Sequence, residues 1–287
     1  MTSKTFFYQF LVTTTVVTAS FMAPAQAADV TVMDLPAVSA FNGKIEAGGG
    51  FADLHNTHST GLFYGAGSLS MPLGQRFGLQ ADLSVVDTLH TTAVGGGAHL
   101  FMRDPNSYLI GAVGGVADAG PANVAWIGGE GELYMGNMSV ELLGGYMGVK
   151  PNGSHHSNKA FVIADLGYYA TDNFRLTLGA SSIAGFDTGH VGFEYMLDSS
   201  PFSITGDVRA GEHGFVAAKV GGTFYFGGNE PNKTLIRRHR EDDPRNRMLD
   251  IFGAGGAAFK KKNSGTPPVV VVCDPEAPGF DPELCGR

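Results

Sequence analysis

Imidazole and carboxylate groups gather in the segments that separate the apolar stretches of this sequence. The histidines are His55, His58, His90, His155, His156 and His213, and the nearby aspartates are Asp53, Asp87 and Asp118. Such a combination would suit zinc or copper. Polar side chains are expected in exposed loops anyway, and no helix or strand fixes the geometry of these. We therefore interpret them as solvated loop residues and predict neither a metal site nor a cofactor.

A second group with chemical potential is the run His155-His156-Ser157-Asn158. A histidine close to a serine is the pairing used in acyl transfer, with the imidazole as general base and the hydroxyl as nucleophile. The run lies in the longest segment between apolar stretches, where nothing fixes its geometry.

A third group consists of twelve charged residues that fall in phase with one another. They are Lys44, Glu46, Asp82, Glu130, Glu132, Glu141, Asp165, Arg175, Glu194, Asp207, Arg209 and Lys219, eight acids and four bases. All lie within stretches in which apolar residues occupy every second position. Twelve in-phase charges indicate one polar face that runs through many elements.

Those elements are β-strands, because strict alternation gives a strand two chemically different faces. The clearest stretch runs from Phe77 to Val85, with apolar residues at every odd position. We predict twelve strands, near residues 44–52, 60–71, 76–86, 92–102, 108–117, 123–135, 138–148, 159–169, 174–182, 188–196, 202–210 and 215–227. Ten strands is the main alternative, since the glycine-rich stretches 92–102 and 108–117 have an ambiguous face.

The breaks between these strands alternate in kind. Short turns such as Gly136-Asn137 and 171–173 alternate with longer loops such as 53–59 and 149–158. An even strand number, with short turns at one end and longer loops at the other, is typical of an up-and-down transmembrane barrel. A twelve-stranded open sheet would leave exposed edges. We therefore predict an all-β, antiparallel up-and-down barrel over residues 28–227.

Aromatic residues cluster near the ends of these strands, as the girdles of membrane barrels do. Near the short turns lie Phe77, Phe101, Tyr108, Tyr134, Tyr168, Phe174, Tyr195, Phe202, Phe224 and Phe226, and near the loops lie Phe51, Phe63, Trp126, Tyr146, Phe161 and Phe215. If the apolar faces meet lipid, the twelve charges line the lumen. A Lys or Arg on the lipid face near the midplane would cost about 2–4 kcal/mol.

Composition agrees with a membrane barrel. Of the 287 residues 42 are glycine, only 16% are charged and the net charge is −8. Ordinary soluble domains have about 25% charged residues and about 7% glycine. High apolar and aromatic content excludes a disordered chain, and a pI near 5.5 gives no support for nucleic-acid binding.

The N-terminus predicts export. Lys4 precedes an apolar stretch from Phe6 to Met22, and Ala25-Gln26-Ala27 is a small-x-small cleavage site. We place a signal peptide over residues 1–27. The alternative is a retained membrane anchor, which Gln9 and several threonines make a poor span.

These features resemble the outer-membrane β-barrel proteins of Gram-negative bacteria. The resemblance covers the signal peptide, residues 28–227 and the closing strand from Lys219 to Phe226, and segments such as 78–82 and 131–137 look like small alphaproteobacterial barrels. It implies an outer-membrane location in contact with lipid and names no activity. In most such proteins the aromatic strand ends the chain, whereas 60 residues follow it here.

The run His155-His156-Ser157-Asn158 is similar to the active-site stretch of outer-membrane phospholipase A, also a twelve-stranded barrel. The match is four residues long, and no other segment of that family is present. Strand phase places His155 and Ser157 on the lumen side, whereas a lipid hydrolase needs them toward lipid. We therefore predict no enzymatic activity and keep lipid hydrolysis as a remote alternative.

Residues 228–287 lose the alternation and are predicted to be a largely flexible periplasmic tail. Asp243-Pro244 is a plausible helix start, with the helix continuing to Phe252. Cys273 and Cys285 could form a disulfide in an oxidising periplasm, although spacing alone does not establish it. A tether to the cell wall or to a periplasmic protein is the sharper alternative for this tail.

Two functions remain open for the barrel. A passive porin-like channel with an acidic lumen would prefer cations among small ions and solutes. The alternative is a filled structural or surface barrel, in which acids and bases pair. Twelve strands lie between filled eight-stranded barrels and open sixteen-stranded ones, and either residues 28–42 or the tail could enter the lumen. The acidity belongs to residues 28–227, with 18 acids and 8 bases.

Overall fold

The computed structural model describes residues 35–53, 59–88, 91–120, 122–151, 157–242 and 244–251. The predicted signal peptide and both cysteines lie outside these residues. All of the described residues belong to one compact unit.

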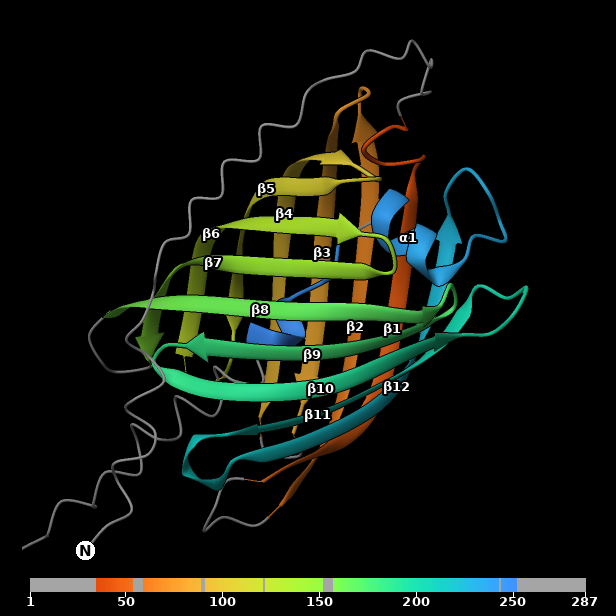
Figure 1. Ribbon diagram of the computed structural model, residues 1–287. Helices are drawn as coiled ribbons and strands as arrows, with labels where there is room; N and C mark the ends of the chain where they lie inside the picture. Colours follow the sequence, from red (N-terminus) through yellow and green to blue (C-terminus); the bar gives the residue numbers. More distant parts are fainter. Residues whose placement is uncertain are drawn as a thin grey trace, which may run out of the picture. The chain divides into compact units, whose positions relative to one another are not determined.

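Twelve antiparallel strands close into a barrel in which each strand pairs with its neighbours in sequence and β1 pairs with β12 (Figure 1). The strands are β1 (Asn42–Asp53), β2 (Thr60–Leu73), β3 (Phe77–Asp87), β4 (Thr92–Asp104), β5 (Tyr108–Asp118), β6 (Ala122–Met135), β7 (Met138–Pro151), β8 (Ser157–Thr171), β9 (Phe174–Ile183), β10 (Phe186–Met196), β11 (Phe202–Gly211) and β12 (Val216–Gly227). The prediction of twelve strands is confirmed, and each predicted stretch coincides with one of them.

The two ends of the barrel differ. We call the end with the β2–β3, β4–β5, β6–β7, β8–β9 and β10–β11 connections the turn end, and the opposite end the loop end. At the turn end, β6 and β7 are joined by Gly136 and Asn137 alone, with Met135 opposite Met138. Gly136 has φ +59°, and glycine is the residue that adopts this conformation at the first central position of a tight hairpin turn.

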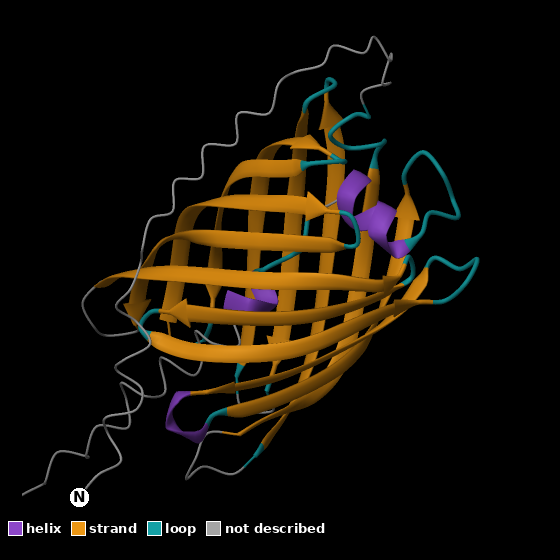
Figure 2. Cartoon of the chain, in the orientation of Figure 1, coloured by secondary structure: helices purple, strands orange, loops and turns teal. Residues whose placement is uncertain are grey.

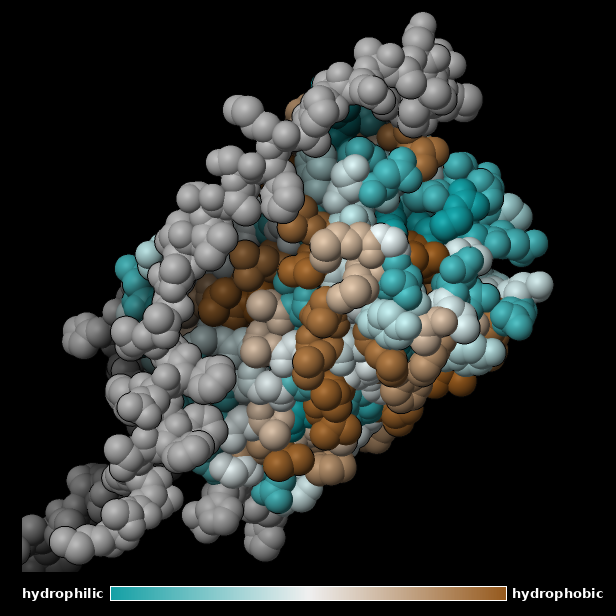
Figure 3. Space-filling view, in the orientation of Figure 1, coloured by the Kyte–Doolittle hydropathy of each residue, from teal (hydrophilic) through white to brown (hydrophobic). Residues whose placement is uncertain are grey.

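The outer face of the wall is apolar, because alternation turns one side of every strand outward. Ile127 and Leu83 are 71% and 62% exposed, although both are large and hydrophobic. Figure 3 shows brown, hydrophobic side chains running across the strands on the visible face. Such a continuous exposed apolar surface marks contact with an apolar environment.

Five of the sixteen predicted girdle aromatics face inward instead. Phe101, Tyr134, Trp126, Phe161 and Phe215 are at most 7% exposed. In β6, Tyr134 and Trp126 occupy even positions, as the inward Glu130 and Glu132 do, so strand parity turns their rings into the barrel.

The helical structure also differs from the prediction. Helix α1 (Leu235–Glu241) precedes the expected start at Pro244, and residues 244–247 are not helical. A helical turn follows at 248–251. Among the described residues, no helix is long and apolar enough to cross a membrane.

Candidate functional site

The structure places the twelve predicted lumen charges on the inner side of the wall. Lys44, Asp82, Glu141, Asp165, Arg175 and Arg209 are buried, and Glu46, Glu130, Glu132, Glu194, Asp207 and Lys219 are half-buried. Strand parity puts them opposite the exposed apolar positions. The barrel interior is therefore the candidate site, and whether these residues line an open pathway depends on what else occupies it.

Two histidines and an arginine also share this face, and sequence reasoning missed them. His99 on β4 lies between two predicted residues, with Nε2 3.0 Å from Asp82 and Nδ1 2.8 Å from Glu130. His190 on β10 has Nε2 3.5 Å from Asp165. Arg103 is 3% exposed at the turn end of β4. The inward face of the glycine-rich β4 was ambiguous in the sequence. In the structure its odd positions face inward, and this assignment identifies His99 and Arg103 as residues of the inner face.

The chain turns into the barrel after β12. Helix α1 lies at the turn end, as Figures 1 and 2 show, where the Ile236 amide donates to the Asp172 carbonyl at 3.0 Å. Arg240 donates to the Met138 carbonyl at 2.8 Å, and its guanidinium lies 5.1 Å from the centre of the Tyr134 ring. Together these contacts fix the helix across the opening at this end.

Segment 35–41, which precedes β1, enters the same end. Ala37 and Val38 are fully buried. The Ser39 amide donates to the Glu241 carbonyl at 2.8 Å, which joins this segment to α1. Val38 packs in a cluster with Phe101, Leu109 and Tyr134. Residues from both flanks of the barrel thus enter its turn end, as the sequence allowed.

Residues 244–251 then cross the interior, and we call them the lumen segment. Lys44 on β1 and Gln80 on β3 both donate to the Pro244 carbonyl, at 3.1 and 3.2 Å. From β8, Asp165 accepts from Arg245 at 2.6 Å. Since β1 and β3 each lie five strands from β8 in a closed ring of twelve, the lumen segment contacts opposite walls and lies between them.

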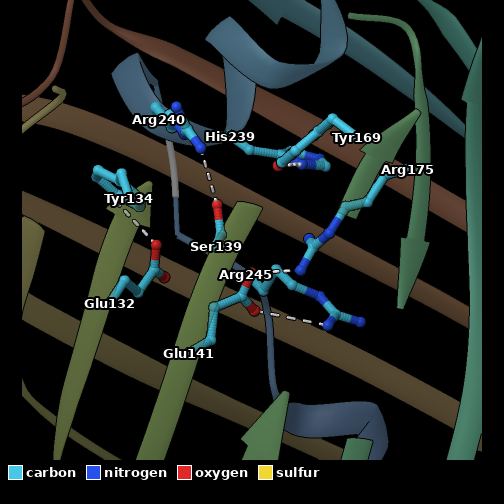
Figure 4. A pocket seen from close by; sticks show the side chains of 9 residues that line it. All are labelled: Glu132, Tyr134, Ser139, Glu141, Tyr169, Arg175, His239, Arg240 and Arg245. Carbon is cyan, nitrogen blue, oxygen red and sulfur yellow. Dashed lines mark hydrogen bonds and ion pairs between the residues drawn. The ribbon is translucent and has the colours of Figure 1, made fainter. Parts of the chain in front are cut away.

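Paired acids on one wall hold two arginines of this segment. Arg247 donates to Glu141 at 2.7 Å and also to Asp165, and Arg245 contacts both acids. Glu141, on β7, also accepts from Arg175 on β9, which lies two strands away. Figure 4 shows Arg175 and Arg245 turned toward Glu141. Three guanidinium groups thus surround two carboxylates in the interior.

These partners shift the pKa values of two charged residues on the lumen segment. Burial would lower the pKa of Arg247, but Asp165 and Glu141 outweigh it and raise that pKa. Burial would raise the pKa of Asp250, yet Arg209 and Arg247 lower it below the ordinary value. Asp250 accepts from Arg209 on β11. Both tail residues are therefore held in their charged forms.

The loop half of the interior is apolar and receives the last described residues. Met248 and Ile251 belong to one buried cluster with wall residues; the wall residues are Val113, Ala117, Ala122, Val124, Trp126, Leu143, Met147, Val149, Phe161, Ile163, Ile183, Phe186 and Phe215. The chain thus runs from the turn end, through a charged layer, into an apolar layer near the loop end. Figure 2 shows the helical turn of this segment between the walls.

Two small cavities lie beside the lumen segment. One cavity, with a volume of about 10 Å³, is lined by Glu132, Tyr134, Ser139, Glu141, Tyr169, Arg175, His239, Arg240 and Arg245 (Figure 4). A second, between Trp126 and Met248, is of the same size. Each has room for about one water molecule. In this conformation the lumen segment occupies the interior between opposite walls.

Other predicted residues are not assembled into a site. Ser157 opens β8, and Asn158 is exposed, while His155 and His156 lie outside the described residues. Of the loop histidines, His213 is described and stands in the short connection before β12. No group of three or more metal-ligating side chains occurs in the described part of the chain.

No protein-family model and no curated protein matches this chain. Among solved structures, the KdgM porin in complex with disordered oligogalacturonate matches with TM-score 0.50 and 13% identity over 64% of this chain and 99% of that one. An outer-membrane channel from Pseudomonas putida F1 matches with TM-score 0.49 and 12% identity over 70% and 100%. Outer-membrane phospholipase A from Escherichia coli matches with TM-score 0.41 and 14% identity over 64% and 92%. The chain thus shares its barrel fold with Gram-negative outer-membrane proteins.

Proposed function

We propose that this protein is a porin-like channel of the Gram-negative outer membrane, with the short turns toward the periplasm. The observation that carries the proposal is the closed barrel with an apolar outer face and a charged inner face. An apolar band suits lipid, and a polar interior suits the passage of small ions or solutes. Short turns are typical of the periplasmic side of such barrels.

A cation preference is the second part of the proposal. The predicted lumen charges comprise eight acids and four bases, and Arg103 adds a fifth base on the same face. An acidic wall attracts cations and repels anions. Because oligogalacturonate is an anionic sugar, we do not extend to this barrel the ligand named for the KdgM porin. Small cations or neutral solutes fit the wall better.

A filled barrel is the competing function, and one observation favours it. The lumen segment contacts opposite walls of the barrel, and the two cavities described beside it, of about 10 Å³ each, are too small for hydrated ions. If the segment stays in place, the protein would act as a structural or surface barrel. We propose no enzymatic role, because the described geometry brings no base to Ser157.

Conductance in planar bilayers tests the channel proposal. The full-length protein and a full-length variant with Arg245→Glu and Arg247→Glu are compared, since that variant loses its hold on the acidic wall. We expect discrete conductance steps from the variant, with a reversal potential in a KCl gradient that favours K⁺. If both proteins insert and neither conducts at any voltage, the channel proposal is wrong and the filled barrel stands.

A further inference from the structure

The lumen segment is attached to the wall through side chains. Lys44 and Gln80 donate to its Pro244 carbonyl, and Asn246 donates to the Gly67 and Leu83 carbonyls at 3.4 and 3.5 Å. Among the described residues, no backbone–backbone hydrogen bond joins residues 244–251 to a strand. The barrel ladder is closed by β1 and β12 without it. The segment can therefore leave without breaking any pair of strands.

The wall presents this segment with two adjoining kinds of surface. One is the pair Glu141 and Asp165, which holds two guanidinium groups. The other is the apolar layer around Trp126, which holds Met248 and Ile251. The sequence Arg245-Asn246-Arg247-Met248 places two bases directly before the first apolar residue. Along the segment the basic residues come before the apolar ones, and along the wall the acidic pair comes before the apolar layer. The two surfaces are therefore complementary in the same order.

We propose that the barrel interior is a binding site for a basic–apolar peptide segment, and that residues 244–251 occupy it as a displaceable plug. The proposal rests on the channel function proposed above. With the plug bound, Arg245 and Arg247 neutralise the acidic pair and the passage is closed. With the plug released, the acidic pair faces the lumen and the passage conducts cations.

The site is distinguished from a permanent core by the kind of group it buries. Glu141, Asp165 and Arg247 have side chains at most 7% exposed, and all are charged. Buried ion pairs give little net stability compared with apolar packing, although they are sensitive to the loss of one partner. A segment held in this way is specific for its partner and remains exchangeable. An apolar core would hold the tail with less discrimination.

Full-length variants test displacement from both sides of the contact. One carries Arg245→Glu and Arg247→Glu in the tail, and the other carries Glu141→Gln and Asp165→Asn in the wall. The control, Arg76→Glu with Lys150→Glu, makes the same charge change at two exposed residues, one in the β2–β3 turn and one near the loop end of β7. We expect both lumen variants to be open at least tenfold more of the time than wild type and the control.

Peptide addition tests the site itself. A synthetic peptide of residues 233–251 is added to the tail variant, whose wall is intact, and should close it in a concentration-dependent way. The same peptide with Glu at positions 245 and 247 should not close it. Neither peptide should close the wall variant at the same concentration, because that wall has lost its acidic pair.

The outcomes separate the two proposals. If the variants conduct and wild type conducts equally, the plug is wrong and the channel stands. If the variants open but the native-sequence peptide does not close them, the peptide site is wrong. If no protein conducts, the channel proposal fails; release of the plug is then measured by protease cleavage of the tail, which should rise in both lumen variants and stay at the wild-type level in the control. Equal cleavage in all four proteins would overturn the plug.

Discussion

Arg247 Nη2 donates to Glu141 Oε2 at 2.7 Å, although the two residues are 106 positions apart. Glu141 belongs to the wall and Arg247 to a segment that follows the last strand. The contact therefore connects the barrel to the chain that fills it. Its side chains are 7% and 5% exposed, so solvent does little to weaken it or to replace it.

The first prediction concerns the strength of this attachment. Replacing Arg247 with Ala leaves Glu141 and Asp165 short of a buried partner, which typically costs about 3–5 kcal/mol. Hydrogen exchange of the Ile251 amide, which donates to the Arg247 carbonyl at 3.1 Å, should then become at least about a hundredfold faster. Arg76→Ala is the control, because Arg76 is exposed in the β2–β3 turn, and should leave that exchange unchanged.

The second prediction uses Trp126, which is the single tryptophan of the chain. Its ring is 6% exposed and shares a buried cluster with Met248. Release of the lumen segment uncovers the ring to water. In the Arg245→Glu and Arg247→Glu variant, we expect emission at longer wavelength and stronger quenching by acrylamide. Met135→Ala, an outward change at the turn end, should leave the spectrum as in wild type; identical spectra for wild type and the lumen variant would contradict the prediction.

The third prediction is a dependence on acid. The pKa of Asp250 is lowered because Arg209 and Arg247, with Arg245 and Lys219 nearby, outweigh the effect of burial. A lowered carboxyl pKa contributes stability above the unfolded-state value of about 3.9, and that stability is lost as pH falls through the lower folded value. Docking should thus be constant from pH 8 to about 5 and weaken below about 4. Trp126 emission measures it.

Asp250→Asn is the matched variant for this titration. It keeps the shape of the side chain and removes the charge that Arg209 contacts. We expect weaker docking already at neutral pH and a smaller change on acidification than in wild type. An acid response of undiminished size would show that other carboxyl groups control it.

The fourth prediction addresses the outer face. Leu83 lies in the middle of β3 and is 62% exposed, whereas Leu73 ends β2 at the turn end and is 43% exposed. An arginine facing lipid at the midplane costs about 2–4 kcal/mol, and about 0–1 near the interface. Leu83→Arg should therefore lower the free energy of unfolding in bilayers far more than Leu73→Arg. Equal effects would argue against a membrane-embedded wall.

The barrel could be predicted from sequence because each strand contains its own signal, the alternation of apolar and polar residues. The alternation from Phe77 to Val85 contains both the strand and its faces, and β3 runs from Phe77 to Asp87. Trp126 shows that the same alternation also predicts which face an aromatic residue occupies. Its parity with Glu130 already assigned it to the inner face, but its place near a strand end suggested a girdle.

The position of the tail could not be predicted in the same way. Arg245 contacts Asp165, which lies 80 positions earlier in the chain. A repeating sequence pattern identifies a strand and its faces, but it does not show which distant strand a short tail segment contacts. The loss of alternation after residue 227 suggested a largely flexible tail, whereas α1 uses Arg240 to contact the Tyr134 ring at the barrel opening. The excess of acids in the barrel did not predict that two tail arginines would pair with Glu141 and Asp165.

The last prediction concerns selectivity once the plug is released. Glu46 and Asp207 lie on the inner face and are half-buried. Among the described residues, neither forms an ion pair with the lumen segment. Their charges should act on passing ions rather than on the tail. In the open variant with Arg245→Glu and Arg247→Glu, adding Glu46→Gln and Asp207→Asn should reduce the K⁺ over Cl⁻ preference without reducing open time. The control Asp104→Asn lies at an exposed turn, and a preference that falls equally with this control would locate the selectivity outside the lumen.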